Sequence, residues 1–175
     1  MRFKEVLNTF ADFFEREKIL YALIGGLAIQ AWGRDSRTTN DVDVATDGTQ
    51  RHKIVQFAES CGFETIHESP SYSNHILGGD RIDFMYLYGT TATSVLTTAP
   101  PRLIFPDVEM PVARPEHLAA MKAMSMKDSP RRVLIDAADV GFLLGVEGVD
   151  RDAIRDFFAR HGLLELFDGI EKHSR

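Results

Sequence analysis

The sequence predicts an α/β (α+β) fold, in which helices flank a mixed β-sheet and a C-terminal helical region follows. Residues 1–113 alternate between helical periodicity and short strand-like runs, whereas residues 114–175 show helical periodicity only. Five of the seven prolines lie between Pro100 and Pro115, where this change occurs. We therefore expect a core domain over residues 1–113 and a helical region over residues 114–175 that packs on it.

Apolar spacing and turn residues define the individual elements. The expected helices are 3–18, 27–32, 49–60, 115–127, 130–144, 150–160 and 162–172. The expected strands are 21–24, 41–45, 63–67, 73–78, 81–87 and the short run 110–113. Gly79-Asp80 is expected to form the hairpin turn between the fourth and fifth of these strands.

Composition narrows the classes of function. The formal net charge of −6 opposes broad, non-specific binding to a phosphate backbone. Cys61 is the one cysteine and cannot form an internal disulfide, which is typical of a reducing compartment. The N-terminus lacks the apolar core of a signal peptide, and no apolar run is long enough to span a bilayer. We expect a cytoplasmic protein without a membrane partner.

The segment LIGGLAIQAWGRDSRTTNDVDVA, residues 23–45, carries the strongest functional signal. Asp41 and Asp43 lie on the same face of a strand, with Cα atoms roughly 6.6 Å apart. Two carboxylates so close repel each other unless a cation lies between them, and Mg²⁺ with its preference for oxygen ligands is the natural choice. The turn at Gly25-Gly26 opens a helix and would present backbone N–H groups to an anion. Together these features predict a site for a metal-bound nucleoside triphosphate.

Two-metal chemistry needs a third carboxylate, and Asp83 is the best candidate. In the run RIDFMYLY, Asp83 shares one strand face with Met85 and Leu87, while Ile82 and Phe84 lie on the other face. If this strand neighbours residues 41–45, Asp83 reaches the same cleft. A surface salt bridge is the competing interpretation of Asp83.

Simpler interpretations of the individual signals exist. An Asp-x-Asp pair alone is usually a solvated strand end, and glycosyltransferases also bind a metal with that pattern. Gly-Gly alone can simply start a helix. A calcium loop of the EF-hand type is excluded, because Ala45, Thr46 and His52 occupy positions that such a loop reserves for other residues. The combination of all the signals in one order is much more specific than any one of them.

The arrangement Ile24-Gly25-Gly26, a spacer and Asp41-Val42-Asp43 resembles the nucleotidyltransferase superfamily that includes DNA polymerase β. The glycine in the second position resembles the Gly-Gly branch, which contains AbiEii-type toxins and small antibiotic nucleotidyltransferases. A second block, RPEHLAAMKAMSMKDSPRRVLIDAADVGFLL, is similar to the downstream helices of the AbiEii-type form. The resemblance implies a nucleotidyltransferase fold for the core.

The resemblance also implies roles for individual residues. Asp41, Asp43 and Asp83 would hold Mg²⁺, with two ions expected, and Asp83 would accept the proton of the attacking hydroxyl. The residues implied to contact the nucleotide are Gly25, Gly26, Arg37, Lys122, Asp136 and Asp139. For three of them a structural alternative stands beside that role: Lys122 can bury its stem and snorkel, and Arg132 can pair with Asp136, which shares a helix face with Asp139.

The function implied is Mg²⁺-dependent transfer of a nucleoside monophosphate from an NTP to an acceptor hydroxyl. The main interpretation is a toxin-like component of a toxin–antitoxin system, with tRNA or a protein as acceptor and an antitoxin as partner. The alternative is a small-molecule enzyme that modifies an aminoglycoside or a lincosamide. A catalytically inactive member that binds a nucleotide or a partner is the non-enzyme alternative.

Overall fold

A computed structural model describes residues 3–34 and 39–173. By their contacts these residues divide into two compact units. Of the described residues, unit 1 holds 3–31 and 39–113, and unit 2 holds 32–34 and 114–173. The predicted packing of the helical region on the core stays a prediction. No helix among the described residues is both long and apolar enough to cross a membrane.

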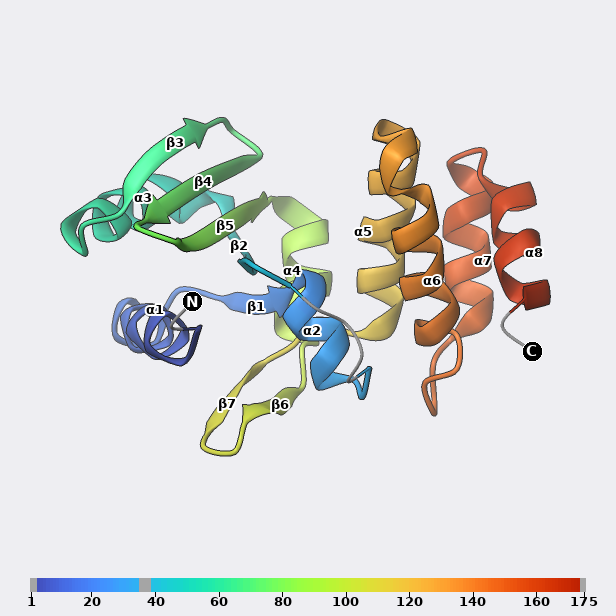
Figure 1. Cartoon of the computed structure of the whole chain (residues 1–175), viewed down its shortest axis with the longest axis horizontal. Coiled ribbons are helices and arrows are strands. Elements are labelled where there is room, and N and C mark those ends of the chain that lie inside the picture. Colours follow the sequence, from blue (N-terminus) through green and yellow to red (C-terminus); the bar gives the residue numbers. More distant parts are fainter. Residues whose placement is uncertain (1–2, 35–38, 174–175) are drawn as a thin grey trace. The chain divides into compact units, whose positions relative to one another are not determined.

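Unit 1 contains a five-stranded mixed sheet, a two-stranded sheet and flanking helices (Figure 1). Its elements are α1 (Phe3–Glu17), β1 (Tyr21–Ile24), α2 (Gly25–Ala31), β2 (Val42–Asp47), the 3₁₀ turn η1 (Gly48–Gln50), α3 (Arg51–Ser60), β3 (Glu64–Glu68), β4 (Tyr72–Leu77), β5 (Asp80–Leu87), α4 (Gly89–Thr97), β6 (Pro101–Phe105) and β7 (Val108–Pro111). The predicted fold class, a mixed sheet flanked by helices, is confirmed.

The large sheet has the order β1-β2-β5-β4-β3. Strands β2 and β5 lie at its centre and run parallel, whereas the other neighbouring strands pair antiparallel. Ile82, Phe84 and Tyr86 point from β5 into the core and are at most 3% exposed, as the alternation of the sequence predicted. The opposite face of β5 carries Asp83, so the same alternation leaves this carboxylate outside the core.

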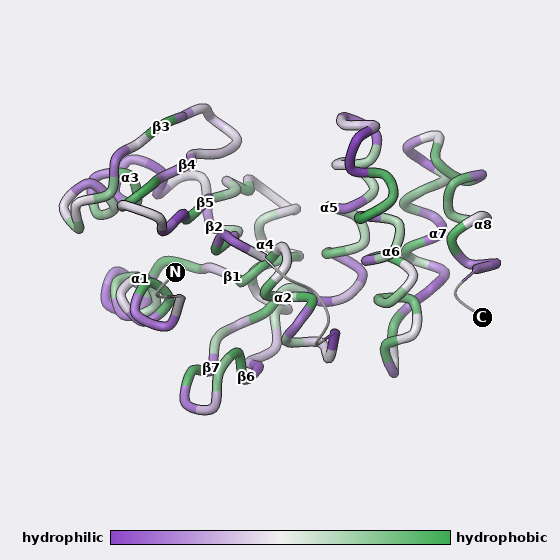
Figure 2. Tube along the Cα trace, in the orientation of Figure 1, coloured by the Kyte–Doolittle hydropathy of each residue, from purple (hydrophilic) through white to green (hydrophobic). Residues whose placement is uncertain are grey.

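Aromatic side chains fill the core between α1, α3 and the sheet. Phe10 lies with its ring centroid 5.2 Å from that of Phe84, and Phe13 stacks on Phe57 at 3.9 Å. Hydrophobic and hydrophilic residues alternate along α1 in Figure 2, as expected for a helix that buries one face. This packing fixes the strands that carry the candidate site.

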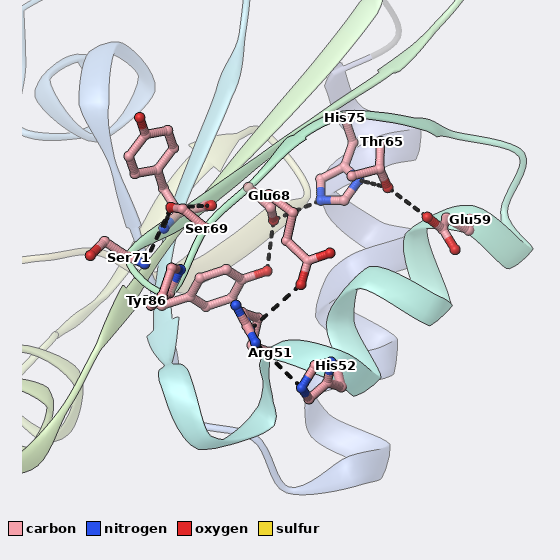
Figure 3. A network of polar contacts seen from close by, with 12 residues as sticks. Arg51, His52, Glu59, Thr65, Glu68, Ser69, Ser71, His75 and Tyr86 are labelled. Atoms are coloured by element: carbon pink, nitrogen blue, oxygen red, sulfur yellow. Dashed lines mark hydrogen bonds and ion pairs between the residues drawn. The ribbon is translucent and has the colours of Figure 1, made fainter.

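The core face of the sheet also contains a polar network (Figure 3). His75 is fully buried, with Nδ1 lying 3.1 Å from the Thr65 hydroxyl and Nε2 lying 2.8 Å from the Ser73 hydroxyl. Ser73 in turn lies 2.6 Å from the Tyr86 hydroxyl, and Thr65 donates to Glu59 on α3. Burial lowers the pKa of His75, against the opposing effect of Glu59, and raises the pKa of Tyr86 to about 12. The network satisfies the polar groups that these strands bury.

Unit 2 is helical. It comprises α5 (Pro115–Asp128), the 3₁₀ turn η2 (Pro130–Arg132), α6 (Val133–Leu143), α7 (Arg151–Arg160) and α8 (Leu164–His173). Helix α5 begins at a proline, as predicted, because a first-turn position needs no N–H donor. Helices α6, α7 and α8 also lie within three residues of their predicted bounds.

The structure differs from the sequence-based expectations in several local features. The hairpin turn falls at Gly78-Gly79, and Asp80 already belongs to β5. Helix α4 and strand β6 were not predicted. Helix α4 is rich in threonine and buries only Ala92, Val95 and Leu96, which weakens its helical pattern. Helix α2 begins at Gly25 itself, two residues earlier than predicted.

Candidate metal and nucleotide site

The site is built on the two central strands of unit 1. Asp43 on β2 is the direct register partner of Asp83 on β5, and Asp41 immediately precedes β2. One carboxylate oxygen from each of the three lies within 4.8 Å of the others, and all three residues are partly exposed. The parallel pairing of the strands therefore brings the predicted acidic residues together.

This donor set fits a divalent cation. Three carboxylates at such short range repel one another, and a hard cation with oxygen ligands relieves that repulsion. Asp41, Asp43 and Asp83 could therefore hold the metal that such a site requires.

Gly25 and Gly26 lie against this cluster because β1 is the other neighbour of β2, with Ile24 opposite Asp43. Gly25 has a φ of +67°, a conformation that side chains rarely adopt. A Cβ atom on Gly26 would lie 2.7 Å from Cβ of Thr39, so the turn leaves no space for a side chain here either. The two glycines thus bring bare backbone up to strand β2, which carries Asp43.

Among the described residues, Thr39 and Arg81 also contact the carboxylates, and neither was given a role from the sequence. The Thr39 hydroxyl donates to Oδ1 of Asp41 at 2.6 Å and fixes that side chain. Arg81 binds both oxygens of Asp83, which it faces from two residues earlier on β5. The hydrogen bond to Asp83 is the main cause of a raised pKa of Arg81, and the charges of Asp41 and Asp43 add to it. Period-2 spacing in the run RID could have indicated this pairing. Arg37 lies outside the described residues.

Lys122, Asp136 and Asp139 belong to unit 2 and form a cluster of their own. Lys122 Nζ lies 2.7 Å from Oδ1 of Asp136 and 2.8 Å from Oδ2 of Asp139, and both carboxylates are fully buried. Asp136 also accepts hydrogen bonds from Ser125 and Arg132, so the predicted Arg132 pairing is confirmed. Burial raises the pKa of Asp136, but the bonds from Lys122 and these neighbours outweigh it and lower the pKa overall.

Arg34 joins this cluster through an ion pair with Asp139. The four charged side chains of Arg34, Lys122, Asp136 and Asp139 therefore tie the short segment 32–34 to helices α5 and α6. These ion pairs give Lys122 and both aspartates a structural role within unit 2. Their contact with a nucleotide stays a prediction.

Comparisons with known proteins agree with this geometry. The family model for aminoglycoside-2''-adenylyltransferase matches residues 6–87, which include Gly25, Gly26 and all three carboxylates. No curated protein sequence matches the chain significantly.

Three solved structures resemble most or nearly all of the chain. The antibiotic-resistance factor ANT(2'')-Ia in solution is 15% identical, with a TM-score of 0.70 over 99% of this chain and 98% of that chain. The lincosamide antibiotic adenylyltransferase LnuA, bound to lincomycin, is 18% identical, with a TM-score of 0.55 over 80% of this chain and 95% of that one. An antigenic nucleotidyltransferase-like protein from Paracoccidioides brasiliensis is 18% identical, with a TM-score of 0.56 over 96% and 91%.

At these identities the solved structures establish a shared fold. The comparisons lend no support to the AbiEii-type branch. The family-model match over residues 6–87, together with the shared fold, supports the nucleotidyltransferase superfamily and indicates a nucleotidyltransferase enzyme.

Proposed function

We propose that the chain is a Mg²⁺-dependent nucleotidyltransferase that transfers a nucleoside monophosphate, in the first instance AMP from ATP, to a hydroxyl of an aminoglycoside. The observation that carries the proposal is the convergence of Asp41, Asp43 and Asp83 within 4.8 Å beside the Gly25-Gly26 turn. Three carboxylates on a rigid central strand pair suit phosphoryl transfer, in which catalysis is mostly positioning and charge stabilisation.

The antibiotic acceptor is favoured over a toxin role by what the chain resembles. ANT(2'')-Ia has been crystallised with adenylyl-2''-tobramycin, and the matching family model is that of an aminoglycoside-2''-adenylyltransferase. The net charge of −6 also favours a cationic acceptor. LnuA makes a lincosamide the next acceptor to test.

In the proposed reaction the acceptor oxygen attacks the α-phosphorus of the NTP. The bond from the α-phosphorus to the bridging oxygen breaks, and pyrophosphate leaves with that electron pair. Asp83 accepts the proton of the acceptor hydroxyl, since it lies on β5, the strand farther from the glycine turn. Asp41 and Asp43 would hold the metal together with Asp83. Bound Mg²⁺ would supply charge neutralisation for the phosphates.

The chain's own residues prepare this geometry. Thr39 fixes the carboxylate of Asp41 at 2.6 Å. The absence of side chains on Gly25 and Gly26 allows backbone N–H groups to approach the triphosphate.

The test is label transfer by the purified full chain. Each of the four NTPs, labelled at the α-phosphate, is incubated with Mg²⁺ and one acceptor: tobramycin, lincomycin, total tRNA or a protein mixture. We expect a labelled antibiotic and stoichiometric pyrophosphate, and neither with the double variant Asp41→Asn, Asp43→Asn.

Other outcomes have defined meanings. Label on tRNA or protein, and none on an antibiotic, would replace this proposal with the toxin interpretation. No transfer to any acceptor, with nucleotide still bound, would indicate an inactive binding protein. Transfer that persists in the double variant would refute the roles of the two aspartates.

A further inference from the structure

Arg81 forms a two-pronged ion pair with one of the three site carboxylates. Its Nε lies 2.9 Å from Oδ1 and 3.0 Å from Oδ2 of Asp83, and its Nη2 lies 2.8 Å from Oδ2. The guanidinium group matches the geometry of a carboxylate in this arrangement, which is stronger and more directional than contact with a lysine. Asp83 is therefore held by a resident cation.

The position of Arg81 gives this cation influence over the whole cluster. Asp83 lies beside Asp43 in the strand register, and the oxygens of all three acids fall within 4.8 Å. A positive charge bound to Asp83 offsets part of their mutual repulsion, which is the effect that a metal ion would also have. The same charge repels a divalent cation that approaches these oxygens.

The exposure of Arg81 leaves room for the pair to open. The side chain of Arg81 is 45% exposed, whereas that of Asp83 is 17% exposed. Arg81 can therefore swing toward solvent, or toward an incoming phosphate, without disturbing the buried face of β5. The carboxylate stays where the strand places it.

We propose that Arg81 is a positioning residue that acts as the resident counter-ion of the site, holding Asp83 and opposing metal binding until a nucleotide arrives. The inference rests on the proposed function, because it takes the three acids as the metal ligands. Triphosphate charge supplies Arg81 with a new partner and the metal with additional ligands. Binding of the metal thus becomes dependent on the nucleotide.

The test measures metal affinity directly, by the EPR signal of free Mn²⁺ titrated with the full chain, with and without α,β-methylene-ATP. We expect Arg81→Gln and Arg81→Met to bind Mn²⁺ about tenfold more tightly than the wild type when the analogue is absent. With the analogue present the difference should shrink. Arg81→Lys keeps the charge and should stay near the wild type.

Arg51→Gln is the matched control, because it removes an arginine of unit 1 that pairs instead with Glu68 at 3.6 Å. Its Mn²⁺ affinity should equal that of the wild type. A purely structural role for Arg81 predicts the opposite of our expectation, namely weaker Mn²⁺ binding in both neutral variants.

Two failures can be told apart. If the wild type binds Mn²⁺ measurably and the two neutral variants bind it no more tightly than the wild type, the inference about Arg81 alone is overturned. Absence of Mn²⁺ binding from wild type and variants, even with the analogue, would overturn the proposed metal site and the inference with it.

Discussion

A Cβ atom on Gly25 would lie 1.9 Å from Oδ2 of Asp43 and 2.8 Å from its Cβ. The backbone of the turn and the side chain of Asp43 on β2 therefore occupy adjoining space with no room for a methyl group. The positive φ of Gly25 independently disfavours a side chain there. Gly25 at the start of α2 and Asp43 on β2 are thus packed so closely that neither can change without affecting the other.

Gly25→Ala should displace Asp43 and abolish most of the activity. A carboxylate shifted by about 1 Å costs on the order of 100-fold in rate, and a strained backbone adds to that loss. Steady-state pyrophosphate release measures the effect. Gly79→Ala is the matched control, because a Cβ there meets no atom within 4 Å and the residue is not among the glycines of positive φ. Near-wild-type activity in Gly25→Ala would contradict the close approach.

Divalent metal should stabilise the folded protein through Asp43. At a Mn²⁺ concentration 100 times the dissociation constant, mass action adds about 2.7 kcal/mol to the free energy of unfolding. The melting temperature should therefore rise with Mn²⁺ and fall again with EDTA. Asp43→Asn should remove this response, while Asp107→Asn, which alters an exposed acid paired with Lys4, should retain it. An equal rise in the Asp43 variant would place the metal elsewhere.

Lys122→Met should destabilise unit 2 by about 3 kcal/mol or more, because it leaves two fully buried carboxylates without their shared cation. Urea unfolding measures the loss. Lys127→Met lies on the same helix and removes an exposed lysine, so it should cost well under about 1 kcal/mol. Replacing Arg34, Lys122, Asp136 and Asp139 together by apolar residues should recover much of the stability. A single variant as stable as the wild type would show that the cluster is energetically neutral.

Stability should decrease as the pH falls below about 6.5, the ordinary pKa of histidine. Burial lowers the pKa of His75 in the folded protein, so the unfolded chain takes up its proton first. The stability that the folded protein gains by keeping His75 neutral is fully present above about pH 6.5. It is lost as the pH falls from there to the lower pKa of His75 in the folded state. Unfolding free energies at about pH 7.5 and 5.5 test this. His75→Gln should weaken the dependence without removing it, because burial also lowers the pKa of His117, and His52→Gln, at an exposed position, is the control.

The acidic cluster could be predicted because it follows from alternation along two strands. Side chains alternate between the two faces of a strand, so Asp43 on β2 and Asp83 on β5 each lie on the face opposite the apolar residues of their strand. The pairing of β2 with β5 was an assumption in the prediction, and the structure supplies it. The fold class followed from the same patterns.

The charged cluster of unit 2 could not be predicted in the same way. Arg34 and Asp139 are 105 residues apart, and no local spacing indicates their contact. From the sequence, Lys122 could equally be a snorkelling lysine. A helical pattern shows which face of the helix a residue occupies, but it does not show which buried charge the residue pairs with. Helix α4 was missed for a different reason, because its threonines weaken the apolar periodicity.

The direct pairing of Asp43 with Asp83 also determines where the chain can change its length. Lengthening a connection between strands leaves the ladder unaltered, so such insertions should be tolerated at modest cost. One residue inserted or deleted within β2 or β5 would reverse the orientation of every side chain beyond it and turn a carboxylate into the core. The two central strands should therefore accept conservative apolar substitutions on their buried faces but no insertions or deletions, while connections that do not contact the carboxylates remain open to insertion.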